Sequence, residues 1–148
     1  MIYIIFAFFL TQSSCISAQY NNSDNEIIAM LNEFYVAYSN IWSTTSLSPD
    51  ILDSKLDSIQ KKYCTLRLRN EAKEYLEDGH DLLTNDYGIG IESIKTLAIM
   101  KDSTEENAYI VTYGVVNSDV TNNPVTQNVL LNVFVVKDEE SFKIDKVK

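Results

Sequence analysis

The sequence predicts an α+β fold in which N-terminal helices pack on a curved, mostly antiparallel sheet of about four strands. Segments with helical spacing of apolar residues fill the first half of the chain, and segments with alternating spacing fill the second half. That order favours separate blocks of helices and strands over alternating βα units. The short turns between the later segments favour an antiparallel meander.

The first helix is expected over residues 24–42. Ser23-Asp24-Asn25-Glu26 has the form of a capping box, in which a serine and a glutamate three residues later satisfy the first free N–H groups. Apolar residues then recur at spacings of three and four, at Ile27, Leu31, Phe34, Tyr38 and Ile41. We expect this apolar stripe to lie in the bend of the sheet.

Two further helices follow. Ser48-Pro49-Asp50 starts the second, because serine is a good cap and proline suits the first turn. Thr65 is expected to cap a third helix that runs to about Glu77, and Gly79 supplies the left-handed residue that ends it. Residues 80–90 are expected to be irregular because Gly88 and Gly90 break any regular pattern.

Four strands are expected, over residues 91–100, 108–117, 126–137 and 141–147. The third has apolar residues on both of its faces, which indicates a central or strongly covered strand. The loops between the strands carry charged residues or the Asn122-Asn123-Pro124 turn signal.

Residues 1–18 are expected to be a signal peptide and residues 19–148 a single domain. The first ten residues are apolar throughout, too few to span a bilayer, and Ser17-Ala18 suits cleavage before Gln19. The alternative is a lipoprotein signal over residues 1–14, because Cys15 follows two serines and would then carry a lipid anchor. Both interpretations place the protein outside the cytoplasm, in a bacterial periplasm or at the cell surface.

Charge and composition exclude several functions. The net charge of −9 repels phosphate backbones, so no nucleic-acid partner is expected. With one histidine, and Cys64 as the one cysteine outside the signal segment, a zinc site is excluded. Gly88-Ile89-Gly90 lacks the third glycine and the lysine of a phosphate loop. We therefore expect no metal and no cofactor.

The candidate site residues fall in two groups. Aromatic rings on the first helix, with large apolar area and polar tips, would line a hollow in the sheet, with core packing as the alternative. The irregular segment crowds titratable groups and an aromatic ring, so acid–base chemistry by a His–Asp dyad is conceivable, with a solvated loop as the alternative. The candidates are Tyr35, Tyr38, Trp42, His80, Asp81, Asp86 and Tyr87, and no catalytic residue is assigned.

Several short motifs resemble one bacterial family. They are Glu33-Phe34-Tyr35, Lys62-Tyr63-Cys64-Thr65, Asp81-Leu82-Leu83 with Asp86, and Phe142-Lys143-Ile144-Asp145-Lys146-Val147, where the family commonly has tryptophan at Phe142. The chain is similar to the DUF3828 family of small secreted or lipoprotein domains of unknown function. The resemblance implies an NTF2-like or cystatin-like cone. It names no catalytic residues, and this fold hosts enzymes, binding modules and interaction domains alike.

The leading hypothesis is an exported, non-enzymatic domain that binds an unknown small molecule or protein at the sheet concavity. A specific version is an immunity or inhibitor protein that neutralises a secreted toxin through its acidic surface. A second class is an NTF2-like enzyme with a His–Asp dyad, which requires His80 to point into the cone beside the aromatic rings. A third class is a structural domain that dimerises through its sheet, so monomer and homodimer both stay open.

Overall fold

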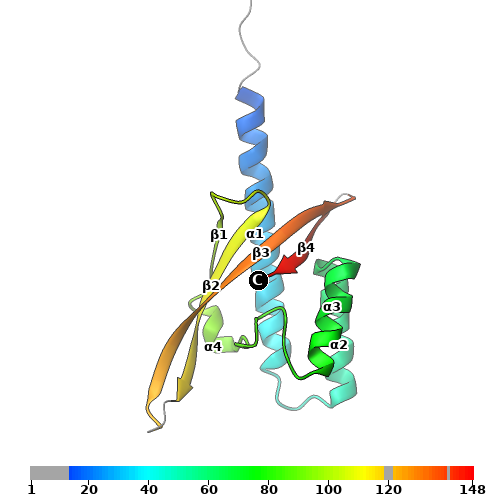
Figure 1. The fold of residues 1–148 in the computed structure, drawn as a ribbon, viewed down its shortest axis with the longest axis vertical. Helices are drawn as coiled ribbons and strands as arrows, with labels where there is room; N and C mark the ends of the chain where they lie inside the picture. Colours follow the sequence, from blue (N-terminus) through cyan, green and yellow to red (C-terminus); the bar gives the residue numbers. More distant parts are fainter. Residues whose placement is uncertain (1–13, 119–121, 140) are drawn as a thin grey trace, which may run out of the picture.

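The structure, a computed structural model, describes residues 14–118, 122–139 and 141–148, with side-chain burial from residue 22 onward. The elements are α1 (Ser14–Trp42), α2 (Pro49–Tyr63), α3 (Leu66–Glu77), α4 (Ile91–Ile94), β1 (Ala98–Lys101), β2 (Ala108–Ser118), β3 (Pro124–Asp138) and β4 (Ser141–Val147). The strands form one antiparallel sheet in the order β1-β2-β3-β4 (Figure 1). The predicted α+β fold, with helices packed against a four-stranded meander, is confirmed.

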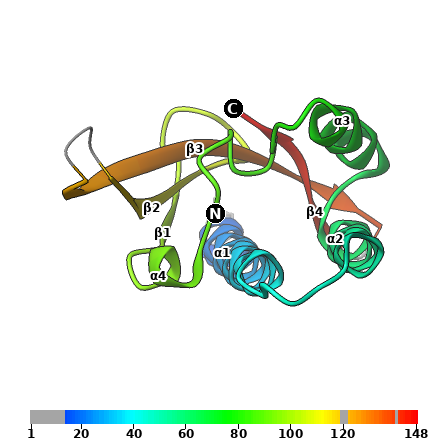
Figure 2. The ribbon, with the colours of Figure 1, turned by 90° about the horizontal axis from the view of Figure 1, so that it is seen from below.

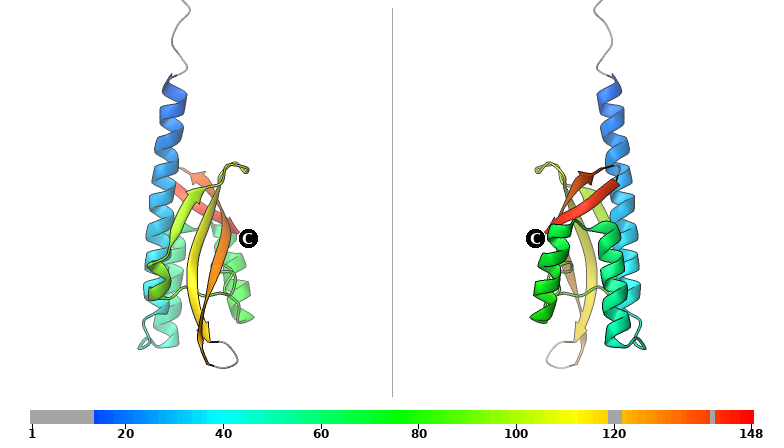
Figure 3. Two further views of the ribbon diagram at one scale, coloured as in Figure 1. Left: turned by 90° about the vertical axis from the view of Figure 1, so that its left-hand side faces the viewer. Right: turned by 90° about the vertical axis from the view of Figure 1, so that its right-hand side faces the viewer.

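Helix α1 begins at Ser14, ten residues earlier than expected, so Ser23 lies inside the helix and the predicted capping box is wrong. Residues 14–23 contain no glycine or proline that would stop a helix. Near its middle, α1 is attached to the sheet through Asp24, whose Oδ1 accepts a 2.6 Å hydrogen bond from the Tyr109 hydroxyl. The preceding turns extend beyond the sheet (Figures 1 and 3). Residues 1–13, most of the expected signal peptide, lie outside the described residues.

The core lies between α1 and one face of the sheet, which Figure 3 shows edge-on. Leu31, Phe34 and Tyr35 of α1 are completely buried. Strands β2, β3 and β4 meet them with alternate residues: Tyr109, Val111, Tyr113, Val129, Leu131, Val133, Val135 and Ile144. The alternation predicted for the second strand is therefore the one that builds the core.

Strand β3 is central, as predicted, but only one of its faces is covered. Leu131 and Val133 are fully buried, whereas Leu130 on the opposite face is 57% exposed and Val136 is 37% exposed. Helix α1 packs against one face of β3 alone. The apolar residues on both faces of this strand therefore do not indicate that a layer covers each face.

The segment expected to be the first strand, residues 91–100, folds differently. Ile91–Ile94 forms the short helix α4, and only Ala98–Lys101 pairs with β2. Gly90 stands at the N-cap of α4, and its carbonyl accepts a 3.0 Å bond from the Ser93 amide. Thr96 then ends the turn, and its hydroxyl accepts the Gly114 amide of β2 at 2.8 Å.

Hydrogen bonds attach the junction between α2 and α3 to β4. Cys64 forms a parallel β-bridge with Ile144, and the Thr65 amide donates to the Ile144 carbonyl at 2.9 Å. The Thr65 hydroxyl accepts from the Leu68 amide, as the predicted cap requires, and also donates to Asp145 at 2.8 Å. Gly79 stands where expected, after the end of α3. Ser48 occupies the predicted N-cap position of α2, but its side chain makes no capping hydrogen bond.

Candidate functional site

The predicted site residues on α1 meet the irregular segment in a cluster of tyrosine hydrogen bonds, which we call the tyrosine clasp. The Tyr38 hydroxyl donates to Asp81 Oδ1 at 3.0 Å, and the Tyr35 hydroxyl donates to the Leu83 carbonyl at 3.4 Å. Tyr113 of β2 reaches the Thr84 carbonyl at 3.5 Å. These three hydrogen bonds hold residues 81–84 against the tyrosine side chains at the sheet concavity.

The clasp fills the hollow. Tyr35 and Tyr38 are 0% and 1% exposed, and Phe34 stacks on Tyr38 with ring centroids 5.4 Å apart. Burial raises the pKa of both tyrosines, and burial also raises the pKa of Asp81 against the opposing effect of its hydrogen bonds. The prediction that Tyr35 and Tyr38 line an open hollow is therefore wrong, and their core-packing alternative holds. Trp42, 37% exposed, lies at the rim, edge-on to Tyr38.

His80 does not point into the cone. Its side chain is 58% exposed, and its Nδ1 lies 3.1 Å from Asp86 Oδ2, itself on a side chain 52% exposed. The cause is local: Gly79 is left-handed, with φ +82°, and the His80 amide closes the helix end by donating to the Tyr75 carbonyl at 2.9 Å. A dyad in a closed pocket, which the enzyme hypothesis requires, is absent at this position. Tyr87 is also exposed, at 43%.

Asp86 holds the irregular segment in shape instead. Its Oδ1 accepts the Asp81 amide at 2.7 Å. Asn85 and Asp86 both adopt left-handed backbone, with φ +49° and +64°. Such conformations persist where surrounding contacts impose them, and here the clasp and the buried Leu83 do so. The acids of this segment thus serve its folding.

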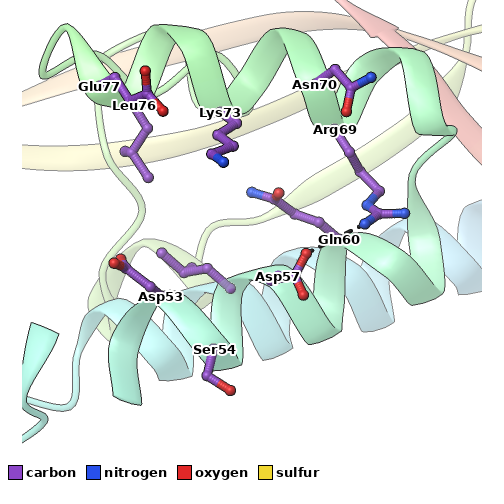
Figure 4. A pocket seen from close by; sticks show the side chains of 10 residues that line it. Asp53, Ser54, Asp57, Gln60, Arg69, Asn70, Lys73, Leu76 and Glu77 are labelled. Carbon is purple, nitrogen blue, oxygen red and sulfur yellow. Dashed lines mark hydrogen bonds and ion pairs between the residues drawn. The ribbon is translucent and has the colours of Figure 1, made fainter. Parts of the chain in front are cut away.

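The structure places an open cavity elsewhere, between α2 and α3. Its volume is about 640 Å³, within the range of ordinary ligand pockets. Figure 4 shows Asp57 and Gln60 of α2 facing Arg69, Lys73 and Leu76 of α3 across it. The remaining lining residues are Asp53, Ser54, Leu56, Asn70 and Glu77. We call this cavity the α2–α3 groove.

Charges in the α2–α3 groove are arranged along its length. Arg69 and Asp57 meet at one end, with Arg69 Nη2 3.3 Å from Asp57 Oδ1, and Lys73 lies near the middle (Figure 4). Asp53 and Glu77 stand at the other end. A hydrogen bond from Lys61 and the nearby Arg69 lower the pKa of Asp57. The groove therefore offers a cationic region and a separate anionic one.

One lining residue of the groove has an unsatisfied buried atom. The Nε of Arg69 is buried and has no hydrogen-bond partner among the described residues. A buried donor without an acceptor costs free energy, so Arg69 is held in place at a cost. A carboxylate is the natural acceptor for a guanidinium because it accepts two parallel N–H groups.

Sequence reasoning missed the groove, although a signal for it exists. Asp53, Asp57 and Gln60 follow each other at spacings of four and three, and so lie on one face of α2. Arg69, Lys73 and Glu77 repeat the pattern at spacings of four on α3. Two polar stripes on consecutive helices are ordinarily solvated faces, and only the joint at Thr65 turns these towards each other.

Within the described ranges, no three His, Cys, Asp or Glu side chains gather in a way that would hold a metal ion. None of the helices in the described part of the chain combines the length and apolar character needed to cross a membrane.

Comparison with known proteins supports the fold. No protein-family model matches the chain, and no curated protein matches it. The chain is similar to a solved structure, a protein of unknown function from Bacteroides thetaiotaomicron VPI-5482. That match has a TM-score of 0.75 and 22% sequence identity, and covers 93% of this chain and 99% of the other. A likeness at this identity establishes the shared fold and leaves function open. The DUF3828 resemblance stays a prediction.

Proposed function

We propose that this protein is a non-catalytic binding domain whose ligand site is the α2–α3 groove. The hypothesis of a ligand-binding domain is kept, while its site moves from the sheet concavity to the groove, because the clasp fills the concavity. The convergence of Arg69 and Lys73 on an open cavity of ligand-sized volume carries the proposal.

The charges suggest the ligand class. Arg69 and Lys73 suit a carboxylate, and the carboxylates of Asp53 and Glu77 towards the other end suit an ammonium group. Leu56 and Leu76 provide apolar surface between them. A small zwitterion with separated charges, such as a short peptide, matches this order of groups.

Triglycine is a suitable probe because its two charges can be removed separately. Its binding to ¹⁵N-labelled protein is measured by NMR, beside N-acetyl-triglycine, which lacks the ammonium group, and triglycine amide, which lacks the carboxylate. We expect triglycine to shift amide signals of α2 and α3, and each capped peptide to bind more weakly. Equal affinities for the three peptides, or no shift of amide signals in either helix, would contradict the proposal.

Variants test the cationic region. Lys73→Ala is expected to weaken triglycine binding by about tenfold, the usual size of one lost charged contact in a partly exposed site. Lys55→Ala removes the same charge from an exposed position of α2 that does not line the groove. It serves as the matched control and should leave binding unchanged.

Export from the cytoplasm belongs to the same proposal. The apolar segment before Thr11 and the small residues before Gln19 support it. Fractionation of expressing bacteria, with mass spectrometry of the mature N-terminus, distinguishes its two versions. Cleavage before Gln19 supports soluble export, a lipidated Cys15 supports an anchored lipoprotein, and an intact Met1 on a cytoplasmic protein contradicts both.

A further inference from the structure

The free edge of β3 has the features of a pairing surface. The β2–β3 hairpin extends past α4 as a two-stranded arm at the lower end of Figure 1. Strand β4 pairs with β3 only from Val133 onward, so the edge of β3 before that point has no neighbouring strand among the described residues. Two-stranded ribbons are marginally stable alone, and a third strand stabilises them.

The direction of the backbone groups on this edge follows from the register. The Asn132 amide donates to the Lys148 carbonyl at 2.9 Å, and the Lys148 amide donates back at 3.0 Å. The N–H and C=O of Asn132 therefore point away from β2. Pairing of β2 with β3 is continuous from Pro124 to Phe134. Because the direction alternates, Thr126, Asn128 and Leu130 also point their N–H and C=O groups away from β2.

Apart from Pro124 at its start, this edge lacks the usual protection. Natural sheets blunt exposed edges with charged side chains, prolines, bulges or a covering element. Residues 122–136 contain no charged side chain, although 22% of the chain is charged. The one register shift of β3 lies between Phe134 and Val135, beyond the free edge. Val125 is 47% exposed and Leu130 is 57% exposed. An edge of this kind is a template for another strand.

We propose that the free edge of β3 pairs with the same edge of a second copy of this chain. An antiparallel strand pair is self-complementary about a two-fold axis, so the same residues serve both sides. The chain carries a net charge of −9, and a surface without charged side chains adds no local repulsion when two copies approach. The uncharged arm is such a surface.

The geometry points to a two-fold axis near Gln127. Thr126 then faces Asn128 of the second copy, and Leu130 faces Pro124 of the second copy. The N–H groups of Thr126, Asn128 and Leu130 all find carbonyls, whereas the Leu130 carbonyl lacks a donor because Pro124 has no N–H. The pairing places the β3 strands of the two copies side by side, so the strand order across the two arms is β2-β3-β3-β2. The α2–α3 groove takes no part in it, so the two proposals fail or succeed separately.

Sedimentation velocity over a wide range of concentrations tests the pairing. We expect a monomer–dimer equilibrium in the wild-type protein. Asn128→Pro removes an outward N–H without touching the β2 ladder, and should weaken dimerisation by about tenfold or more. Asn128→Lys should act in the same direction by charging the edge, whereas Asn117→Lys, an exposed residue on β2 of the same arm, should not.

Cross-linking tests the register. Residues on a two-fold axis through a non-hydrogen-bonded pair have Cα atoms about 4.5 Å apart, within disulfide reach. Gln127→Cys, in a chain carrying Cys15→Ser, should form a covalent dimer on mild oxidation, and Asn117→Cys should not. A wild-type protein that stays monomeric at all concentrations, or equal cross-linking of the two variants, would overturn the proposal.

Discussion

Replacing Asp81 tests whether the tyrosine clasp closes the fold. Its Oδ1 accepts from the Tyr38 hydroxyl and from the Leu83 amide, each at 3.0 Å. Asp81→Ala leaves both donors buried without an acceptor, and each such donor costs about 1–3 kcal/mol. Removal of a largely buried carboxylate offsets part of that cost. We expect a net loss of about 2–4 kcal/mol in the free energy of unfolding.

Asp81→Asn separates the hydrogen bonds from the charge. It keeps a side-chain oxygen acceptor, so at neutral pH we expect it to lie within about 1 kcal/mol of wild type. Burial raises the folded-state pKa of Asp81, so the folded protein holds this proton more tightly than the unfolded chain does. The wild-type protein should therefore gain stability relative to Asp81→Asn as the pH falls through the raised pKa towards 4.

Urea unfolding followed by fluorescence of Trp42, the single tryptophan, measures both effects. Asp78→Ala is the matched control, because Asp78 is an exposed aspartate at the end of α3, three residues before Asp81. The reasoning is refuted if Asp81→Ala and Asp78→Ala unfold at the same urea concentration, or if the gap between Asp81→Asn and wild type does not change with pH.

Three further predictions concern other parts of the fold. Burial raises the pKa of the Cys64 thiol to about 12, so a thiol reagent at mildly alkaline pH should modify the unfolded chain quickly and the native protein only at its opening rate; rapid native-state labelling would contradict this. Gly79→Ala should cost about 1 kcal/mol because φ is +82° there, whereas Gly90→Ala, at φ −92°, should cost less in the same thermal melt. The Arg67 guanidinium, 2.8 Å from Asp145, and the Thr65 hydroxyl hold the pKa of Asp145 below its usual range. Asp145→Asn should therefore lower stability at neutral pH, and this difference should vanish as the pH falls through that lowered pKa; a difference that persists in acid would exclude the ion pair as its cause.

Much of the fold could be predicted from local patterns. The alternation in residues 108–117 and the Thr65 and Gly79 signals each depend on a few neighbouring residues, and each stands where it was expected. The failures also have local causes. Ser23 and Glu26 form a cap pattern, but nothing in residues 14–22 stops the helix, so it continues through them.

The site was harder to predict because it depends on long-range geometry. Tyr38 and Asp81 were both predicted as binding-site residues, and a hydrogen bond does join them. Because Tyr38 is buried, however, this contact belongs to the core. The groove forms because the Thr65 joint, bound to Ile144 and Asp145, turns Arg69 to face Asp57. Thr65 and Asp145 are 80 positions apart in the chain, and no short motif encodes a contact between them.

The most direct test of whether the α2–α3 groove is the binding site is to map where a ligand binds. Titration of ¹⁵N-labelled protein with triglycine reports on each backbone amide separately. The account predicts shifts concentrated at residues lining the groove, around Gln60, Arg69 and Lys73, with Leu83 and Thr84 of the clasp unchanged. Shifts at Leu83 and Thr84 with none along α2 and α3 would contradict it, and would return the site to the sheet hollow.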